Sequence, residues 1–378
     1  MLDNFRVQMT QNWAVQVGAA LLAIGCLAGC ALNANAQALA LASPLSPTTR
    51  PFRFPTPTPT PLPTPASAAT VEGATATDPT PYRFAVLAGD LAAAYPALSE
   101  HDRFTLHYDP DAPPAIAPDE LATLVAQILA HHEQMLGATL TGRFDVYAAG
   151  TLFAPPDQAL RGHSFSRSRR FHVMVDNGIT SAAQRYIVAH ELTHLFAWNT
   201  FGVPSSVLLS EGLAVYAGLD FAGDGLLPLR DFCAAYAQAG ALPHVSANLV
   251  YQGHIRNLEH YYAAGCFVQF LIEEHGAAAF ARLYSTGDYT GVYGQSLADL
   301  ETAWLAEAAS TPLAAPISPA ALVTAVDQTQ SAYLALLAAF EGLPEQVTAY
   351  RRLDAQWSAV LAGQIADEGG KDKGTEHE

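Results

Sequence analysis

The chain has 378 residues, a formal net charge of −17 and only 14% charged side chains. This acidic balance excludes nucleic acid as a natural partner and makes direct binding to an anionic lipid surface unfavourable. The length allows a sizeable core, as one large domain or as two lobes. No internal repeat, phosphate-binding glycine loop or Ser/His/Asp nucleophile pattern stands out, so the function has to be inferred from other motifs.

An apolar stretch near the N-terminus predicts export. Residues 13–29 are mostly apolar but short for a membrane span, and only Arg6 is basic before them, so residues 1–29 are interpreted as a signal peptide. The stretch ends in Leu27-Ala-Gly-Cys30, which resembles the lipobox of bacterial lipoproteins and implies a lipid anchor on Cys30. Cys26 is a poorer second choice, and an uncleaved N-terminal anchor is the alternative. We therefore expect an extracytoplasmic protein that is lipid-anchored to the bacterial cell membrane.

A proline-rich stalk is expected to follow Cys30. It covers residues 30–81 and is centred on the run Pro55-Thr-Pro-Thr-Pro-Thr-Pro-Leu-Pro-Thr-Pro65. Such a run favours polyproline II at about 3.1 Å per residue, which makes an extended spacer. Binding to an aromatic groove of a partner is the alternative role of such a segment.

The folded part is expected to begin near Tyr82 with a small sheet backed by helices. Alternating apolar residues predict three strands, at Phe104–Tyr108, Phe144–Ala148 and Phe171–Val175. A helix over Pro118–Leu136 is predicted between the first two, because it has a proline at its start and Gly137 as a stop.

A long helix then carries the pattern His190-Glu-Leu-Thr-His194. Residues four apart lie on one face of a helix, so His190 and His194 are close enough to bind one metal ion, for which zinc is the natural occupant. Glu191 points to the side, where it can reach a water on the metal. Chance matches usually lie on a solvated helix face, whereas apolar flanks such as Ile187 and Val188 predict a buried helix, in which imidazoles without a partner would be costly.

Glu211 is the predicted third ligand, since a catalytic zinc needs three protein ligands and one open position. It is the only carboxylate between the two histidines and Asp220, and it lies in an apolar stretch with helical spacing. A buried carboxylate without a partner is expensive, and zinc would provide one. A helix N-terminal acid after Ser210 is the alternative reading of Glu211, and Asp220 is interpreted as a surface or outer acid.

The rest of the chain is predicted to be mainly helical. Helices are expected over Leu229–Ala239, Tyr261–His275, Ala277–Thr286 and Leu297–Ala309, and a helical hairpin over Ala320–Phe340 and Glu345–Ile365. The hairpin is expected to pack against the preceding domain, with partner binding as the alternative. Cys233 and Cys266 could form a disulfide or remain two buried thiols. The polar tail 367–378 is expected to be disordered.

Two motifs together resemble the gluzincin metallopeptidases, and specifically the peptidase MA-like domains of bacterial envelope proteins. They are His190-Glu-Leu-Thr-His194 and Ser210-Glu-Gly-Leu-Ala-Val-Tyr216, with a weaker third motif at Tyr262–Leu271. The resemblance spans roughly 104–309. It implies an α+β, zincin-like fold with a small mixed-sheet lobe and a mainly helical second lobe, and the C-terminal helical hairpin predicted from the residues is added to it. The expected domains are 82–310 for the peptidase and 311–366 for the hairpin.

The resemblance also assigns roles to residues. It implies that His190, His194 and Glu211 bind Zn²⁺ and that Glu191 is the general base. Tyr262 is the expected oxyanion donor, with Tyr261, His254 and His260 as alternatives. The last strand before the metal helix is expected to be the edge to which a substrate backbone adds, which gives Phe171, His172, Val173, Met174 and Val175.

The sequence departs from this family in two places. Thermolysin-like enzymes have an aspartate one turn after the glutamate ligand, where this chain has Val215. It also lacks the Gly-x-Met-Glu-Asn segment of the membrane alanyl aminopeptidases. The expected function is thus a membrane-tethered zinc endopeptidase acting on a peptide or protein. The alternative is a non-enzymatic envelope module that binds a partner and holds a structural zinc.

Overall fold

The computed structural model describes residues 85–87, 89–152, 161–175, 181–223, 226–248, 258–314, 317–339 and 343–364. All of them belong to the second of the two units into which the chain divides, Thr75–Glu378. The expected signal peptide, Cys30, the stalk and the tail 367–378 lie outside the described residues. None of the helices in the described ranges combines the length and the hydrophobicity that a membrane span requires.

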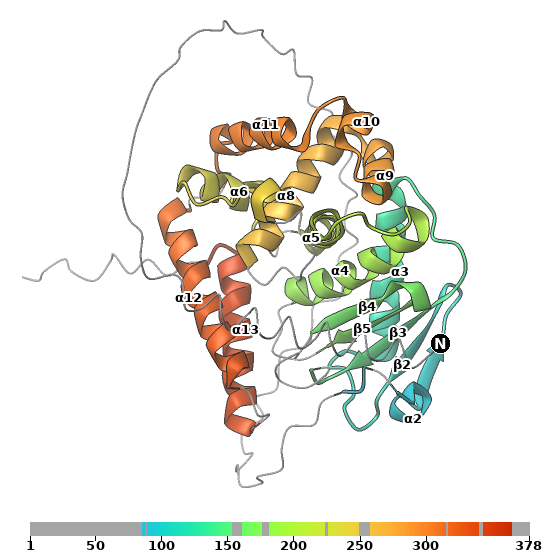
Figure 1. The fold of residues 1–378 in the computed structure, drawn as a ribbon. Coiled ribbons are helices and arrows are strands. Elements are labelled where there is room, and N and C mark those ends of the chain that lie inside the picture. Colours follow the sequence, from blue (N-terminus) through green and yellow to red (C-terminus); the bar gives the residue numbers. More distant parts are fainter. Residues whose placement is uncertain are drawn as a thin grey trace, which may run out of the picture. The chain divides into compact units, whose positions relative to one another are not determined.

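A mixed five-stranded sheet carries the N-terminal part of the fold (Figure 1), in the strand order β1-β2-β3-β5-β4. Its strands are β1 Ala97–Glu100, β2 Phe104–Tyr108, β3 Phe144–Ala149, β4 Gly162–Phe165 and β5 Arg170–Met174. The three central strands are parallel, and β1 and β4 pair antiparallel at the two edges. The connection from β2 to β3 runs through helix α3, Pro118–Leu136, because parallel neighbours need a crossover. The predicted α+β class with a small mixed sheet is confirmed.

The three predicted strands are all present, but one expected role for them is wrong. The segment Phe171–Val175 was expected to be a free edge, whereas β5 is an interior strand. On one side Val173 pairs with Ala148 of β3, and on the other side it pairs with Gly162 of β4. The 3₁₀ turn Ser166–Ser168 folds β4 back onto β5, so β4 is the edge on this side of the sheet.

Helix α3 has the predicted bounds, and Gly137 ends it in the left-handed conformation at φ 63°. Helix α4, Ser181–Thr200, contacts α3 and the two strands β4 and β5. Helix α5, Val207–Ala222, packs against α4, and α8, Leu258–His275, packs against α5 (Figure 1). Buried side chains such as Val146, Phe171 and Leu192 give this layer its apolar core. The stack of α4 and α5 beside the β4 edge is what positions the site.

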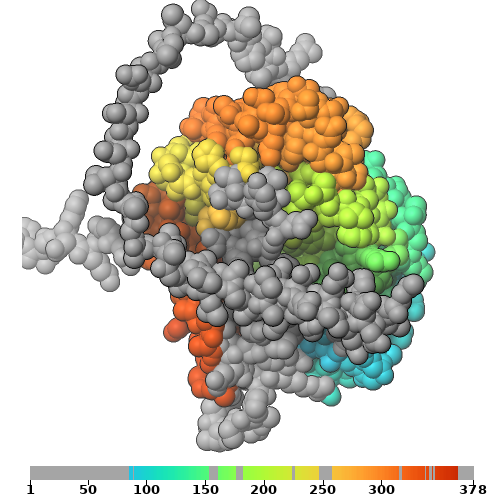
Figure 2. Space-filling view, in the orientation of Figure 1, coloured from blue at the N-terminus to red at the C-terminus, as the bar shows by residue number. Residues whose placement is uncertain are grey.

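Most of the remaining helices contact α8 or one another. They are α2 Leu91–Ala94, α6 Leu229–Gln238, α7 Val245–Asn248, α9 Ala277–Thr286, α10 Tyr289–Tyr293, α11 Leu297–Ser310, α12 Pro319–Ala338 and α13 Pro344–Leu361. Helix α11 packs against α6, as the adjacent orange and yellow surfaces of Figure 2 show. Helices α12 and α13 pack against each other, and α12 also contacts α6 and α8. A disulfide joins Cys233 of α6 to Cys266 of α8, so the two cysteines are not free thiols.

Candidate metal centre

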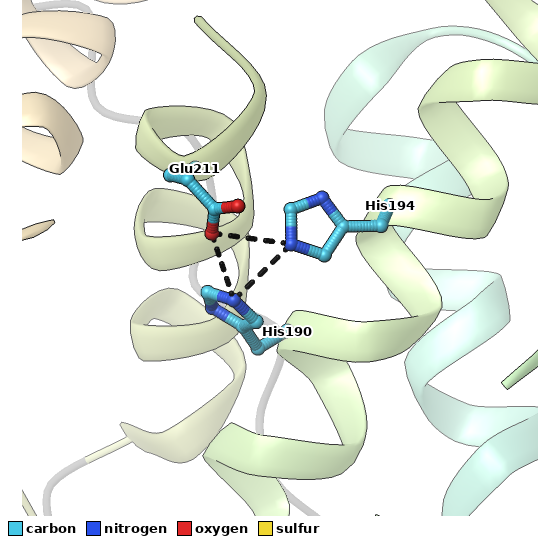
Figure 3. Close-up of side chains that lie close together, drawn as sticks. All are labelled: His190, His194 and Glu211. Carbon is cyan, nitrogen blue, oxygen red and sulfur yellow. Dashed lines mark hydrogen bonds and ion pairs between the residues drawn. The ribbon is translucent and has the colours of Figure 1, made fainter. Parts of the chain in front are cut away.

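Three side chains from two helices converge on one point (Figure 3). Nε2 of His190 lies 3.2 Å from Nε2 of His194, and Oε2 of Glu211 lies 3.4 Å from the first nitrogen and 3.3 Å from the second. Both histidines come from α4 and the glutamate comes from α5. The structure thus brings together the three ligands that the sequence predicts, and no other metal-binding cluster occurs within the described residues.

The spacing of these three atoms fits a tetrahedral zinc ion. Zinc binds histidine nitrogen and carboxylate oxygen at about 2.0–2.1 Å, which separates neighbouring ligand atoms of a tetrahedron by about 3.3–3.4 Å. The observed separations, 3.2 Å, 3.3 Å and 3.4 Å, lie at this value. With two imidazoles and one carboxylate, the donor set matches a catalytic site that keeps one position open.

Two local features of the helices set this arrangement. The spacing of four residues puts both imidazoles on the α5 side of α4, whose neighbouring residues Leu192 and Leu195 are fully buried. Helix α5 begins just before Glu211, where the side chain of Ser206 accepts a hydrogen bond from the backbone of Leu209. Glu211 then lies on the second turn of α5, facing α4.

The ligands are electrostatically coupled even without an ion. Burial disfavours a charged imidazole, but the carboxylate of Glu211 outweighs burial and raises the pKa of His194 to about 9. Burial alone would also raise the pKa of Glu211, whereas His194 and His190 hold it well below its usual range. A proton on His194 therefore competes with a metal ion for this site.

Glu191 lies beside the three ligands. It is almost completely buried, and burial raises the pKa of its carboxyl group, against the opposing effect of His190 and His194. A raised pKa suits a general base. The edge strand β4 runs directly past this carboxylate. A Cβ atom built on Gly162 would lie only 2.5 Å from Oε1 of Glu191. Gly162, which the sequence analysis did not single out, is thus the residue that lets β4 approach Glu191.

The outer nitrogens of the two histidines have partners that the sequence analysis also missed. Nδ1 of His194 lies 3.2 Å from the hydroxyl of Ser210, which is also hydrogen-bonded to Tyr284. Nδ1 of His190 lies 3.5 Å from the hydroxyl of Tyr186. Burial, together with Glu211 and Glu191, raises the pKa of Tyr186, so its hydroxyl stays protonated at neutral pH. Both residues could have been found from the sequence, since Tyr186 lies one helical turn before His190 and Ser210 lies next to Glu211.

The expectation for Tyr262 is wrong. Its side chain is 1% exposed, and its ring packs 4.3 Å from the ring of Phe232 on α6. Tyr261 faces the site instead, with its ring 6.4 Å from the ring of His190. Consecutive residues of a helix point about 100° apart, so only one of two adjacent tyrosines on α8 can face α4. Burial and the nearby carboxylates of Glu211 and Glu191 raise the pKa of Tyr261, which keeps it a proton donor.

The other candidates from the sequence do not join the centre. His254 lies outside the described residues. Within the described part of the chain, His260 on α8 contacts none of the three ligands. Asp220 pairs with His131 at 2.8 Å, with half of its side chain exposed, and so behaves as a surface acid.

Comparisons with known proteins give similarity in structure only. The sequence matches no protein-family model, and no curated protein matches it. One similar solved structure is an M1 zinc metallopeptidase from Deinococcus radiodurans, a glutamate-to-alanine mutant bound to a Tyr-Ser-Ala substrate, with 17% identity over 57% of this chain and a TM-score of 0.37. Another is a two-domain M1 zinc metallopeptidase mutant bound to L-tryptophan, with 16% identity over 58% of this chain and a TM-score of 0.35. The chain covers 50% and 52% of their respective lengths.

Proposed function

We propose that this protein is a zinc-dependent endopeptidase that acts outside the cytoplasm while tethered to the membrane by a lipid on Cys30. The observation that carries the proposal is the position of Glu191, a buried carboxylate beside a His/His/Glu cluster but not part of it. A purely structural zinc site has no use for a base next to its ligands. An edge strand that runs past the same carboxylate supports peptide as the substrate class.

Each residue of the site has its own role in the proposed reaction. When bound by His190, His194 and Glu211, zinc would polarise the scissile carbonyl and acidify a water molecule. Glu191 would take a proton from that water and later deliver it to the leaving amine. The substrate backbone would pair with the free edge of β4, which puts the scissile bond beside Glu191. Tyr261 would donate its hydroxyl proton to the developing oxyanion.

The finer parts of the proposal rest on the sequence. The lipobox at Leu27–Cys30 and the proline-rich stalk support export and tethering. The missing Gly-x-Met-Glu-Asn segment supports an endopeptidase over an aminopeptidase. The Cys233–Cys266 disulfide fits an oxidising compartment. A non-enzymatic envelope module with structural zinc is the second candidate, favoured only by the departure at Val215.

Glu191→Gln tests the proposal directly. Glutamine has the shape of glutamate but cannot accept the proton, so we expect peptide cleavage to fall about 10²–10⁴-fold while one zinc ion stays bound. Cleavage would be followed with a fluorogenic peptide library blocked at both termini, with and without a zinc chelator, and zinc content by elemental analysis. Glu274→Gln, at an exposed position on α8, is the matched control and should keep the wild-type rate. A wild-type rate in Glu191→Gln overturns the mechanism, and bound zinc without any cleavage by the wild type favours the binding module.

A further inference from the structure

The outer nitrogen of His190 has no aspartate beside it of the kind that thermolysin-like enzymes place one turn after the glutamate ligand, because this chain has Val215 there. Its Nε2 points at the other two ligands, so the ring must keep its proton on Nδ1 in order to bind a metal as a neutral imidazole. Metal-binding histidines almost always donate that proton to an acceptor, which fixes the tautomer and the orientation of the ring. The question is which side chain accepts it here.

Val215 cannot be the acceptor. It lies one turn after Glu211 on α5, is fully buried, and its side chain packs against α8. A Cβ atom built on Gly265 of α8 would lie 2.5 Å from Cγ1 of Val215, so the two helices are in close contact at this point. This position contributes to packing and offers no hydrogen-bond acceptor.

We propose that Tyr186 is the positioning residue for His190, with its hydroxyl oxygen accepting the Nδ1–H of the imidazole. The two residues are one turn apart on α4, their rings meet edge to face at 5.6 Å, and the hydroxyl lies 3.5 Å from Nδ1. In the described part of the chain, no other side chain hydrogen-bonds to this nitrogen. The inference rests on the zinc site of the proposed function.

The ring of Tyr186 lies close against Gly218 of α5. A Cβ atom on Gly218 would lie 3.0 Å from Cδ2 of Tyr186 and 3.1 Å from Cε2. Because residue 218 has no side chain, the ring of Tyr186 fits between α4 and α5. The two histidine ligands are thus oriented independently, His190 by Tyr186 from its own helix and His194 by Ser210 from α5.

A phenol differs chemically from a carboxylate in this role. A carboxylate that accepts the Nδ1–H makes a histidine ligand more basic and strengthens its bond to the metal. A neutral hydroxyl in the same place has a smaller effect. His190 would therefore donate less charge to the zinc ion, which leaves the ion more electrophilic and more weakly held.

Tyr186→Phe tests the inference, because it removes only the hydroxyl. We expect the zinc Kd of the full chain, measured by competition with a chromogenic chelator, to rise about tenfold. Tyr236→Phe removes a buried tyrosine hydroxyl on α6 and should keep the wild-type Kd. Gly218→Ala is a second variant, which displaces the ring but keeps the hydroxyl, and should also weaken zinc binding.

Proton resonances of the cobalt-substituted protein provide a measurement that a general loss of packing would not affect. Each Nδ1–H of a cobalt-bound histidine gives a strongly shifted proton resonance that persists only while the proton is protected from exchange with water. Tyr186→Phe should lose the resonance of His190 and keep that of His194, and Ser210→Ala should do the reverse. Zinc affinity and both resonances unchanged in Tyr186→Phe overturn the inference and leave the proposed function standing. A wild-type chain that binds no zinc overturns both.

Discussion

At the scale of single residues, Gly162 brings the edge strand close to the buried carboxylate of Glu191. Any side chain at this position would occupy the space of Glu191, since its Cβ atom would lie 2.5–2.8 Å from Oε1, Cγ and Cδ of that residue. Glu191 therefore keeps its present position beside the strand because residue 162 is glycine.

Gly162→Ala should impair catalysis without removing the metal. The added methyl group has to displace either Glu191 or β4, so we expect kcat/KM for a peptide substrate to fall at least tenfold, with zinc content unchanged. Steady-state cleavage together with elemental analysis measures both quantities. Ser99→Ala, on β1 at the other edge of the sheet, should leave both unchanged. Full activity of Gly162→Ala would mean that β4 does not stay close to Glu191.

The three ligands could be predicted from the sequence because their signal is local. Two histidines four residues apart share a helix face whatever the rest of the fold does, and Glu211 stands out as a carboxylate in an apolar stretch. The choice between Tyr261 and Tyr262 was not predictable. It depends on the rotation of α8 about its own axis, and Tyr262 packs against Phe232 of the neighbouring helix α6.

At the scale of secondary-structure elements, α3 and α4 meet at a buried histidine. Nε2 of His132 on α3 lies 2.8 Å from the hydroxyl of Thr193 and 3.2 Å from the carbonyl of Ala189 on α4. Because the threonine hydroxyl itself donates to that carbonyl, the proton of the neutral imidazole is on Nε2. Burial lowers the pKa of His132 to about 4.

This histidine makes the stability of the fold depend on pH. An unfolded chain binds a proton at His132 near pH 6.5, whereas the folded chain resists it down to about pH 4, so the free energy of unfolding falls as the pH drops between these values. The pKa difference sets the contribution at roughly 3 kcal/mol. His132→Gln keeps a donor and cannot titrate, so urea unfolding of metal-free protein should show a shallower loss between pH 6.5 and 4. The remaining slope includes His172, whose pKa burial lowers to about 3. An unchanged slope would show that His132 is accessible to protons in the folded state.

The elements themselves were predictable to different degrees. Helix α3 and strands β2, β3 and β5 were found because they have clear apolar periodicity and, in α3, a proline start and a glycine stop. Strands β1 and β4 were missed, because each has only four residues and neither has a buried face. Because β4 was not predicted, β5 looked like the last strand of the sheet, and its residues were assigned to the substrate edge.

At the scale of the whole described unit, an ion pair joins the start of β4 to helix α13. Arg161, the residue before β4, pairs with Asp354 of α13, and Asp354 is only 3% exposed. The sequence predicts both hairpin helices from their composition, but it does not predict this pairing, because nothing local connects the two charges. Helix α13 is therefore linked by this ion pair to the strand that passes Glu191.

Asp354→Asn should weaken this coupling. Removing one charge of a buried ion pair leaves the other without compensation, so we expect the free energy of unfolding to fall by about 3 kcal/mol. We also expect KM for a peptide to rise, since β4 loses an anchor at the residue that precedes it. Denaturant unfolding and steady-state kinetics measure the two effects. Arg352→Gln, at an exposed position of α13, is the control and should change neither. A stability equal to that of the wild type would show that the pair contributes no net energy.

The pairing of Arg161 with Asp354 also bears on when the site can form during biosynthesis. Glu191, Glu211 and β4 leave the ribosome well before α13, so Arg161 at the start of β4 has its partner only after residue 354 has been synthesised. We expect a nascent chain to hold its metal ligands early but its substrate edge late. Under the proposed function, such an order would delay peptide cleavage until α13 has been synthesised and has folded against Arg161.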